Sequence, residues 1–169
     1  AQTSNSSPYS RYGLGDLNNT GFSSQFAMGG LSMPLAYGSQ LNISNPASYS
    51  YLKRPVFDFG VQSKTIALGT ESEEQVTNSV SLRNIGFGFP VAKRWGLSFG
   101  LLPFSSTGYS ISSTDYYEAI DGDVQTTYEG SGGINQFYIG SAYQLINRGD
   151  STVLSVGFNA SYMFGSVER

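Results

Sequence analysis

The 169-residue sequence contains neither cysteine nor histidine. Without cysteine the chain forms no disulfide and has no thiol nucleophile, and without both residues it lacks the usual ligands of a zinc site. Catalytic relays that pair serine or cysteine with histidine are excluded for the same reason. We therefore expect no enzyme activity, no metal site and no cofactor.

Charge is also scarce. Charged residues make up 12% of the chain, about half of the ~25% that soluble domains carry. Nine Lys and Arg against twelve Asp and Glu leave a net charge of −3, so the chain has no basic surface for nucleic acid. Disorder is not indicated either, because aromatic residues make up 14% of the sequence and disordered chains are poor in them.

Long apolar runs are missing as well. No segment reaches the ~18 to 20 consecutive apolar residues of a membrane-spanning helix. A transmembrane β-strand needs an apolar residue only at every second position, which is compatible with the mean hydropathy of −0.18. The chain begins at Ala1 rather than at Met; cleavage of a signal peptide leaves such an end, and so does trimming.

The sequence divides near residue 54 into two parts of different composition. Residues 1–54 are rich in Ser, Asn, Gly, Tyr and Pro and follow neither a helical nor a strand period. Residues 55–169 alternate β-branched or aromatic residues with polar or small ones between turn signals, which predicts antiparallel strands. The expected strands are residues 56–70, 76–91, 95–117, 124–145 and a last one from residue 152 onward.

Irregularities are predicted in three of these strands. The apolar positions change parity between Leu82 and Ile85, which indicates a bulge near Asn84. Pro103 cannot donate to a ladder, so the third strand is expected to be interrupted there. The glycine pair at 132–133 predicts a kink in the fourth strand.

We expect the strands to belong to an antiparallel transmembrane β-barrel. Five strands cannot close such a barrel, because bacterial barrels have about eight or more and an open edge cannot face lipid. The 169 residues are therefore expected to be the N-terminal part of a longer chain, with residues 1–54 as a plug-like segment and residues 55–169 as the first strands.

Two short motifs lie in the segment before the strands: Ala27-Met28-Gly29-Gly30, and then Asn45-Pro46-Ala47. Together with the strand pattern, this pair resembles the N-terminal region of FadL-like outer-membrane proteins. That family includes long-chain fatty-acid and hydrocarbon transporters and barrels of type 9 secretion. The resemblance implies a fourteen-stranded barrel whose N-terminal segment forms a hatch in the lumen.

The resemblance also implies roles for particular residues. Gly29 and Gly30 would allow a tight backbone path in the hatch, and Pro46, between Asn45 and Ala47, would set a turn before the first strand. Pro103 would mark a lateral gate through which ligand leaves the lumen; an ordinary bulge is the alternative interpretation.

A polar cluster is predicted from the strand alternation. Asp58, Lys64 and Arg83 fall on inward positions of the first two strands, where polar groups are allowed because the lumen is wet or contacts the hatch. We expect these residues to hold the hatch through salt bridges rather than to bind a substrate.

Three functions follow from these observations. The leading hypothesis is passive transport of a hydrophobic compound through a hatch-plugged barrel in the outer membrane, with membrane lipid and a hydrophobic small molecule as partners. The alternative is a structural or assembly subunit of a larger outer-membrane complex for secretion or protein insertion. A secreted β-rich adhesin or carbohydrate-binding module is the third.

Overall fold

The computed structural model describes residues 8–19, 21–31, 36, 38–69, 74–117, 122–148 and 152–168. Short helices and a two-residue strand make up the N-terminal segment: η1 (Pro8–Arg11), β1 (Asp16–Leu17), α1 (Ser23–Ala27) and η2 (Pro46–Tyr51). Five long strands follow: β2 (Val56–Gly69), β3 (Glu74–Ala92), β4 (Trp95–Tyr117), β5 (Gly122–Asn147) and β6 (Val153–Glu168). No helix in the described ranges has the length and apolar character needed to cross a membrane.

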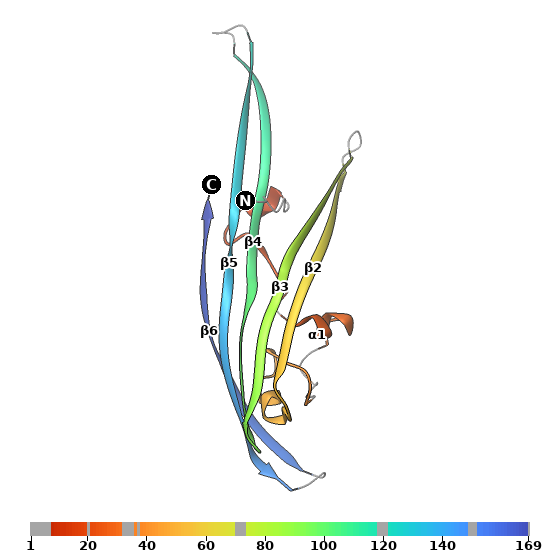
Figure 1. Cartoon of the computed structure of the whole chain (residues 1–169). Coiled ribbons are helices and arrows are strands. Elements are labelled where there is room, and N and C mark those ends of the chain that lie inside the picture. The colour runs from red at the N-terminus through yellow and green to blue at the C-terminus, as the bar shows by residue number, and fades with distance from the viewer. Residues whose placement is uncertain are drawn as a thin grey trace.

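The long strands form one antiparallel sheet in the order β2-β3-β4-β5-β6 (Figure 1). The short strand β1 pairs with β4. The prediction of an all-β antiparallel fold is confirmed, and each long strand starts within two residues of its expected position. Within the described residues the sheet is open, because β2 pairs only with β3 and β6 only with β5. The two-residue β1 was not predicted, because a strand of this length has no period.

The predicted bulge near Asn84 is confirmed. Gly60 pairs with Asn84 and Val61 with Leu82, so Arg83 is the extra residue on β3. A second register shift leaves Phe104 unpaired on β4, directly after Pro103, as the missing N–H of proline leads one to expect. On β5, Gly132 has a φ of 134°, a conformation that residues with a side chain rarely adopt.

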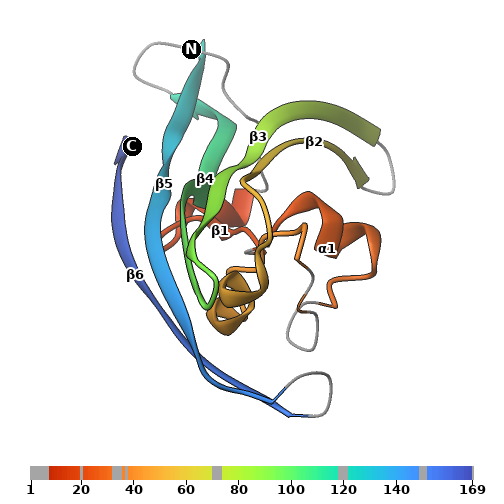
Figure 2. The ribbon, with the colours of Figure 1, turned by 60° about the horizontal axis from the view of Figure 1, so that its bottom comes forward.

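The sheet is curved, and α1 and η2 lie within its concave side (Figure 2). A core of buried side chains joins this N-terminal segment to the concave face: Phe22, Leu41, Tyr49, Leu52, Leu102, Tyr138 and Ala142. Phe22 of the segment meets Tyr138 of β5 edge to face, with ring centroids 6.3 Å apart. Burial of these rings and aliphatic groups holds the segment against the sheet.

Backbone groups of the segment are satisfied by side chains of the sheet. The amide of Gln144 donates to the carbonyl of Ser50 at 2.9 Å, and that of Asn159 donates to the carbonyl of Ile43 at 2.8 Å. These bonds come from β5 and β6 and fix the position of the irregular chain before and within η2. The segment therefore needs little regular secondary structure of its own.

Candidate interaction surface

The convex face of the sheet carries large apolar side chains that are exposed. Residues that pair across strands share a face, and one such row contains Phe57, Phe87 and Phe99, with successive ring centroids 4.7 and 5.4 Å apart. The exposed apolar residues of this convex face include Phe57, Phe59, Val61, Val80, Phe87, Trp95, Phe137, Ile139, Tyr143, Ile146, Leu154, Val156, Phe158, Tyr162 and Phe164. We call this set the apolar band.

The apolar band covers only part of the sheet. On β5 it runs from Phe137 to Ile146, and on β6 from Leu154 to Phe164. The same face of the β4–β5 hairpin beyond the band is polar: Ser110 donates to Glu129, and Ser112 is hydrogen-bonded to Thr127. Each band segment matches the roughly 9 to 11 residues with which a tilted strand crosses a bilayer core.

The concave face is lined with glycine where the N-terminal segment lies on it. A Cβ atom at Gly86 would collide with the ring of Phe22, and one at Gly88 with the side chain of Leu41. Gly96 lies directly under the carbonyl of Tyr49. Gly140 and Gly157 face the Tyr49 ring and the Ala47 backbone in the same way. The strands therefore lack side chains where the segment comes closest.

The two motifs of the N-terminal segment lie in different surroundings. Gly29 and Gly30 form the turn after α1 with φ values of 72° and 84°, and a Cβ atom on either would meet open space. The Asn45-Pro46-Ala47 motif begins η2, with Pro46 at its first position and Ala47 against Gly157 of β6. Both motifs therefore have a local backbone function: a left-handed turn and a helix start.

The polar residues Asp58 and Arg83 lie next to α1. The guanidinium of Arg83 stacks over the ring of Phe26, 3.3 Å from its centroid, and donates a hydrogen bond to Gln62. Asp58 accepts a hydrogen bond from the Asn84 amide, whose oxygen accepts one from Ser23 of α1 at 3.1 Å. The contacts that tie α1 to the sheet are thus a cation–π contact and an amide bridge.

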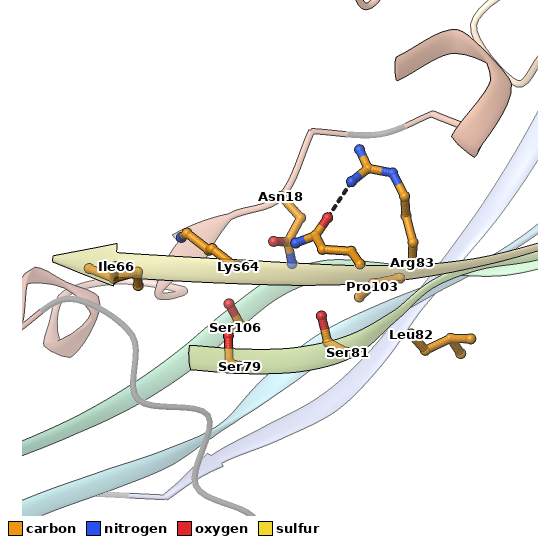
Figure 3. A pocket seen from close by; sticks show the side chains of 10 residues that line it. Asn18, Lys64, Ile66, Ser79, Ser81, Leu82, Arg83, Pro103 and Ser106 are labelled. Atoms are coloured by element: carbon orange, nitrogen blue, oxygen red, sulfur yellow. Dashed lines mark hydrogen bonds between the residues drawn. The ribbon is translucent and has the colours of Figure 1, made fainter. Parts of the chain in front are cut away.

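Lys64 belongs to a different place, a cavity of about 130 Å³ between β2, β3 and β4 (Figure 3). Arg83 and Pro103 line the same cavity, so the structure brings Pro103, the predicted gate residue, together with two members of the predicted polar cluster, Lys64 and Arg83. The remaining lining residues are Asn18, Gln62, Ile66, Ser79, Ser81, Leu82 and Ser106. Two of the described lining residues are cationic, and none of them is a carboxylate.

Sequence reasoning missed the residues that hold the N-terminal segment in place, both within the segment and on the sheet. Gln25 is one of them: its side-chain oxygen accepts the Phe22 N–H at 3.0 Å and its amide reaches the Leu41 carbonyl at 3.4 Å. The glycines of the concave face are another such group. Their spacing by two residues at 86 and 88 and by four at 96 and 100 puts each pair on one face of its strand, and this was the signal that could have revealed a surface for close backbone packing.

The described residues define an open antiparallel sheet with an apolar convex face and a concave face filled by its own N-terminal segment. The model of the BamG family matches residues 1–169, so the chain belongs to the BamG family. No curated protein and no solved structure matches the chain.

Membership of the BamG family shows that the resemblance to FadL-like proteins is wrong. That resemblance depended on two short motifs, which the structure explains as a glycine turn after α1 and the start of η2. Such turn chemistry recurs in unrelated folds. The fourteen-strand count, the hatch and the transport of a hydrophobic compound came with the resemblance and lose their basis.

Proposed function

We propose that this protein is an assembly subunit of the Bam complex, the machinery that inserts proteins into the outer membrane. The observation that carries the proposal is the match of the BamG family over residues 1–169. The structure is compatible with this role because it offers extended surfaces for a membrane and for partner proteins. The subunit acts without covalent chemistry, by holding and orienting other chains.

The apolar band supports a position within the outer membrane. Soluble monomers rarely expose contiguous apolar patches of this kind, and the polar hairpin beyond the band is suited to water. We infer that the sheet is one wall of a transmembrane β-barrel with the band facing lipid. Further strands, from this polypeptide or from another chain, pair with β2 and β6, since an unpaired edge cannot face lipid.

The N-terminal segment supports the wall from inside. It contacts strands from β2 to β6, and its core side chains fill the concave face. A sheet held in this way keeps its curvature while its strand edges and the polar hairpin remain available to partners. The role we assign to the segment is to brace the sheet.

Affinity purification of the tagged full-length protein from native outer membranes in mild detergent tests the proposal. We expect the Bam insertion proteins to co-purify in fixed proportion and a reciprocal tag on one of them to recover this protein. A lone monomer in both experiments would overturn the proposal. The variant Ser112→Thr, on the exposed polar hairpin, is the matched control and should purify with the same partners.

A further inference from the structure

The ladder between β3 and β4 ends early. It runs from Ala92 and Trp95 to Ile85 and Leu101, whereas β3 continues to pair with β2 as far as Glu74. β4 likewise continues with β5 as far as Tyr117. The two hairpins therefore separate, as Figure 1 shows, and the separation starts at the two bulges.

The β4 side of this opening already receives an added strand. Asp16 and Leu17 of β1 pair antiparallel with Ser106 and Ser105, and the Asn18 N–H donates to the Phe104 carbonyl at 2.9 Å. Extended chain therefore fits within the opening. Opposite β1, residues 74–84 of β3 pair with β2 on one side and, within the described part of the chain, with no strand on the other.

The side chains along this β3 edge differ between the two faces. On the concave side, Ser79 and Ser81 pair with Lys64 and Gln62, and Arg83 lies at the bulge beside them. These residues line the cavity of Figure 3, and among its described lining residues two are cationic and none is a carboxylate. On the convex side, Val80 is exposed, and the half-buried Leu82, which pairs with Val61 of that face, also borders the cavity.

We propose that the β3 edge over residues 76–83 binds an extended segment of another outer-membrane protein by strand addition. Backbone hydrogen bonds to β3 supply affinity, as in other cases of β-augmentation. The bound strand carries an acidic side chain toward Lys64 and Arg83 and apolar side chains toward Val80 and Leu82. The inference rests on the proposed function, because it names the kind of partner segment that such a subunit would hold.

Binding of synthetic peptides to the purified full-length protein in detergent tests this inference. The probe is a fluorescent ten-residue peptide that alternates leucine with serine and has one central glutamate; its anisotropy reports binding. Replacing the glutamate with lysine should weaken binding about fivefold, since one partly exposed charge contact is at stake. N-methylation of alternate peptide nitrogens should abolish binding, because it removes the donors that pair with β3.

The variant Lys64→Glu should reverse the preference, so that the lysine peptide binds more tightly than the glutamate peptide. Lys53→Glu, an exposed lysine outside the cavity, is the matched control and should leave the preference unchanged. Circular dichroism checks that both variants fold. Equal binding of the N-methylated and unmethylated peptides, or an unchanged preference in Lys64→Glu, would refute strand addition at β3.

The outcome is separable from that of the proposed function. Failure of peptide binding together with intact co-purification of the Bam proteins refutes only the β3 site. Specific peptide binding by a protein that purifies alone refutes the assignment to the complex and leaves the β3 site standing.

Discussion

The two faces of the sheet differ in the size of their side chains, which are large on the convex face and absent at the glycines of the concave face. On the convex face, paired positions carry aromatic and branched residues that stay exposed, such as Phe158 and Tyr162 at 65% and 70%. On the concave face, the neighbouring positions Gly157 and Gly140 carry no side chain, and the chain around Ala47 and Tyr49 lies on them. We propose that the convex face meets the membrane, whereas the concave face receives the protein's own N-terminal segment.

The difference shows that apolar exposure here is organised rather than scattered. If the convex residues were buried by the protein's own core, the N-terminal segment would lie on that side; it lies on the glycine side instead. Close backbone contact depends on the absence of Cβ atoms, whereas the membrane face that we propose depends on apolar bulk. Substitutions that exchange these properties should therefore have different consequences on the two faces.

The largest effect is expected on the convex face. Phe158→Arg places a charge in the middle of the apolar band, and in a lipid-facing position this costs about 2–4 kcal/mol. The fraction of protein that resists extraction from outer membranes by alkaline carbonate should fall. Ser112→Arg, on the polar hairpin of the same face, is the control and should stay in the membrane; equal retention of both variants would contradict the assignment of the band.

The next largest effect is expected on the concave face. Gly96→Leu puts a side chain where the carbonyl of Tyr49 lies, and such overpacking costs roughly 1–3 kcal/mol. The N-terminal segment should detach, so that trypsin cleaves after Lys53 faster than in the unmodified protein; the next bond, Arg54–Pro55, resists trypsin in both proteins. Ala160→Leu, an exposed position on the convex face, adds similar bulk and should leave the cleavage rate unchanged. Equal cleavage rates in both variants would show that the glycines of the concave face are not required to hold the N-terminal segment.

A smaller, pH-dependent effect is expected from Tyr49. Burial raises the pKa of Tyr49 to about 12 from an ordinary value of 10.0, although contacts with Asn159 and Ser98 limit the rise. The neutral form is favoured in the folded state, so the stability is full below pH 10 and declines as the pH rises toward 12. The decline amounts to about 1.4 kcal/mol per pH unit in that window.

Urea unfolding at pH 9 and pH 11 measures this effect. The unmodified protein should lose more stability between the two values than Tyr49→Phe, which has no hydroxyl to ionise at this position. An identical loss in both proteins would mean that Tyr49 ionises as freely in the folded state as in the unfolded one.

The smallest effect is expected at α1. Phe26→Leu keeps an apolar side chain but removes the ring beneath the Arg83 guanidinium, and a cation–π contact is worth about 1 kcal/mol at a partly exposed site. Amide hydrogen exchange over residues 23–27 should become faster. Lys64→Met removes a nearby cation that does not stack on Phe26 and serves as the control. Equal exchange rates in the two variants would show that contacts other than the one between Phe26 and Arg83 stabilise α1.

Much of the sheet could be predicted because the local sequence of each strand indicates which residues face the same side and where the pairing is interrupted. Alternation from Phe57 to Val61 places one strand, and the parity change before Ile85 places the Arg83 bulge. Proline chemistry likewise places the interruption after Pro103. Each of these signals is local, so no knowledge of distant residues is needed to read it.

The N-terminal segment could not be predicted in the same way. Its order comes from contacts with residues far along the chain, such as Gln144 with Ser50 and Asn159 with Ile43, and no period within the segment records them. The motifs at 27–30 and 45–47 carry only turn geometry, so they suggested the wrong family. The cavity next to Lys64 likewise arises from the separation of β3 and β4, which depends on how both bulges bend their strands.

Site-specific labelling tests the central claim, that the convex face lies in the membrane, most directly. Because these 169 residues contain no cysteine, Phe158→Cys and Ser112→Cys each introduce the one thiol of this part of the protein. In opened outer-membrane fragments, a water-soluble maleimide should label Ser112→Cys and leave Phe158→Cys unmodified. A fluorophore attached at residue 158 after detergent extraction should then be quenched by brominated lipids on reconstitution. Labelling of Phe158→Cys as fast as Ser112→Cys, or a fluorophore at 158 that brominated lipids do not quench, would contradict the claim.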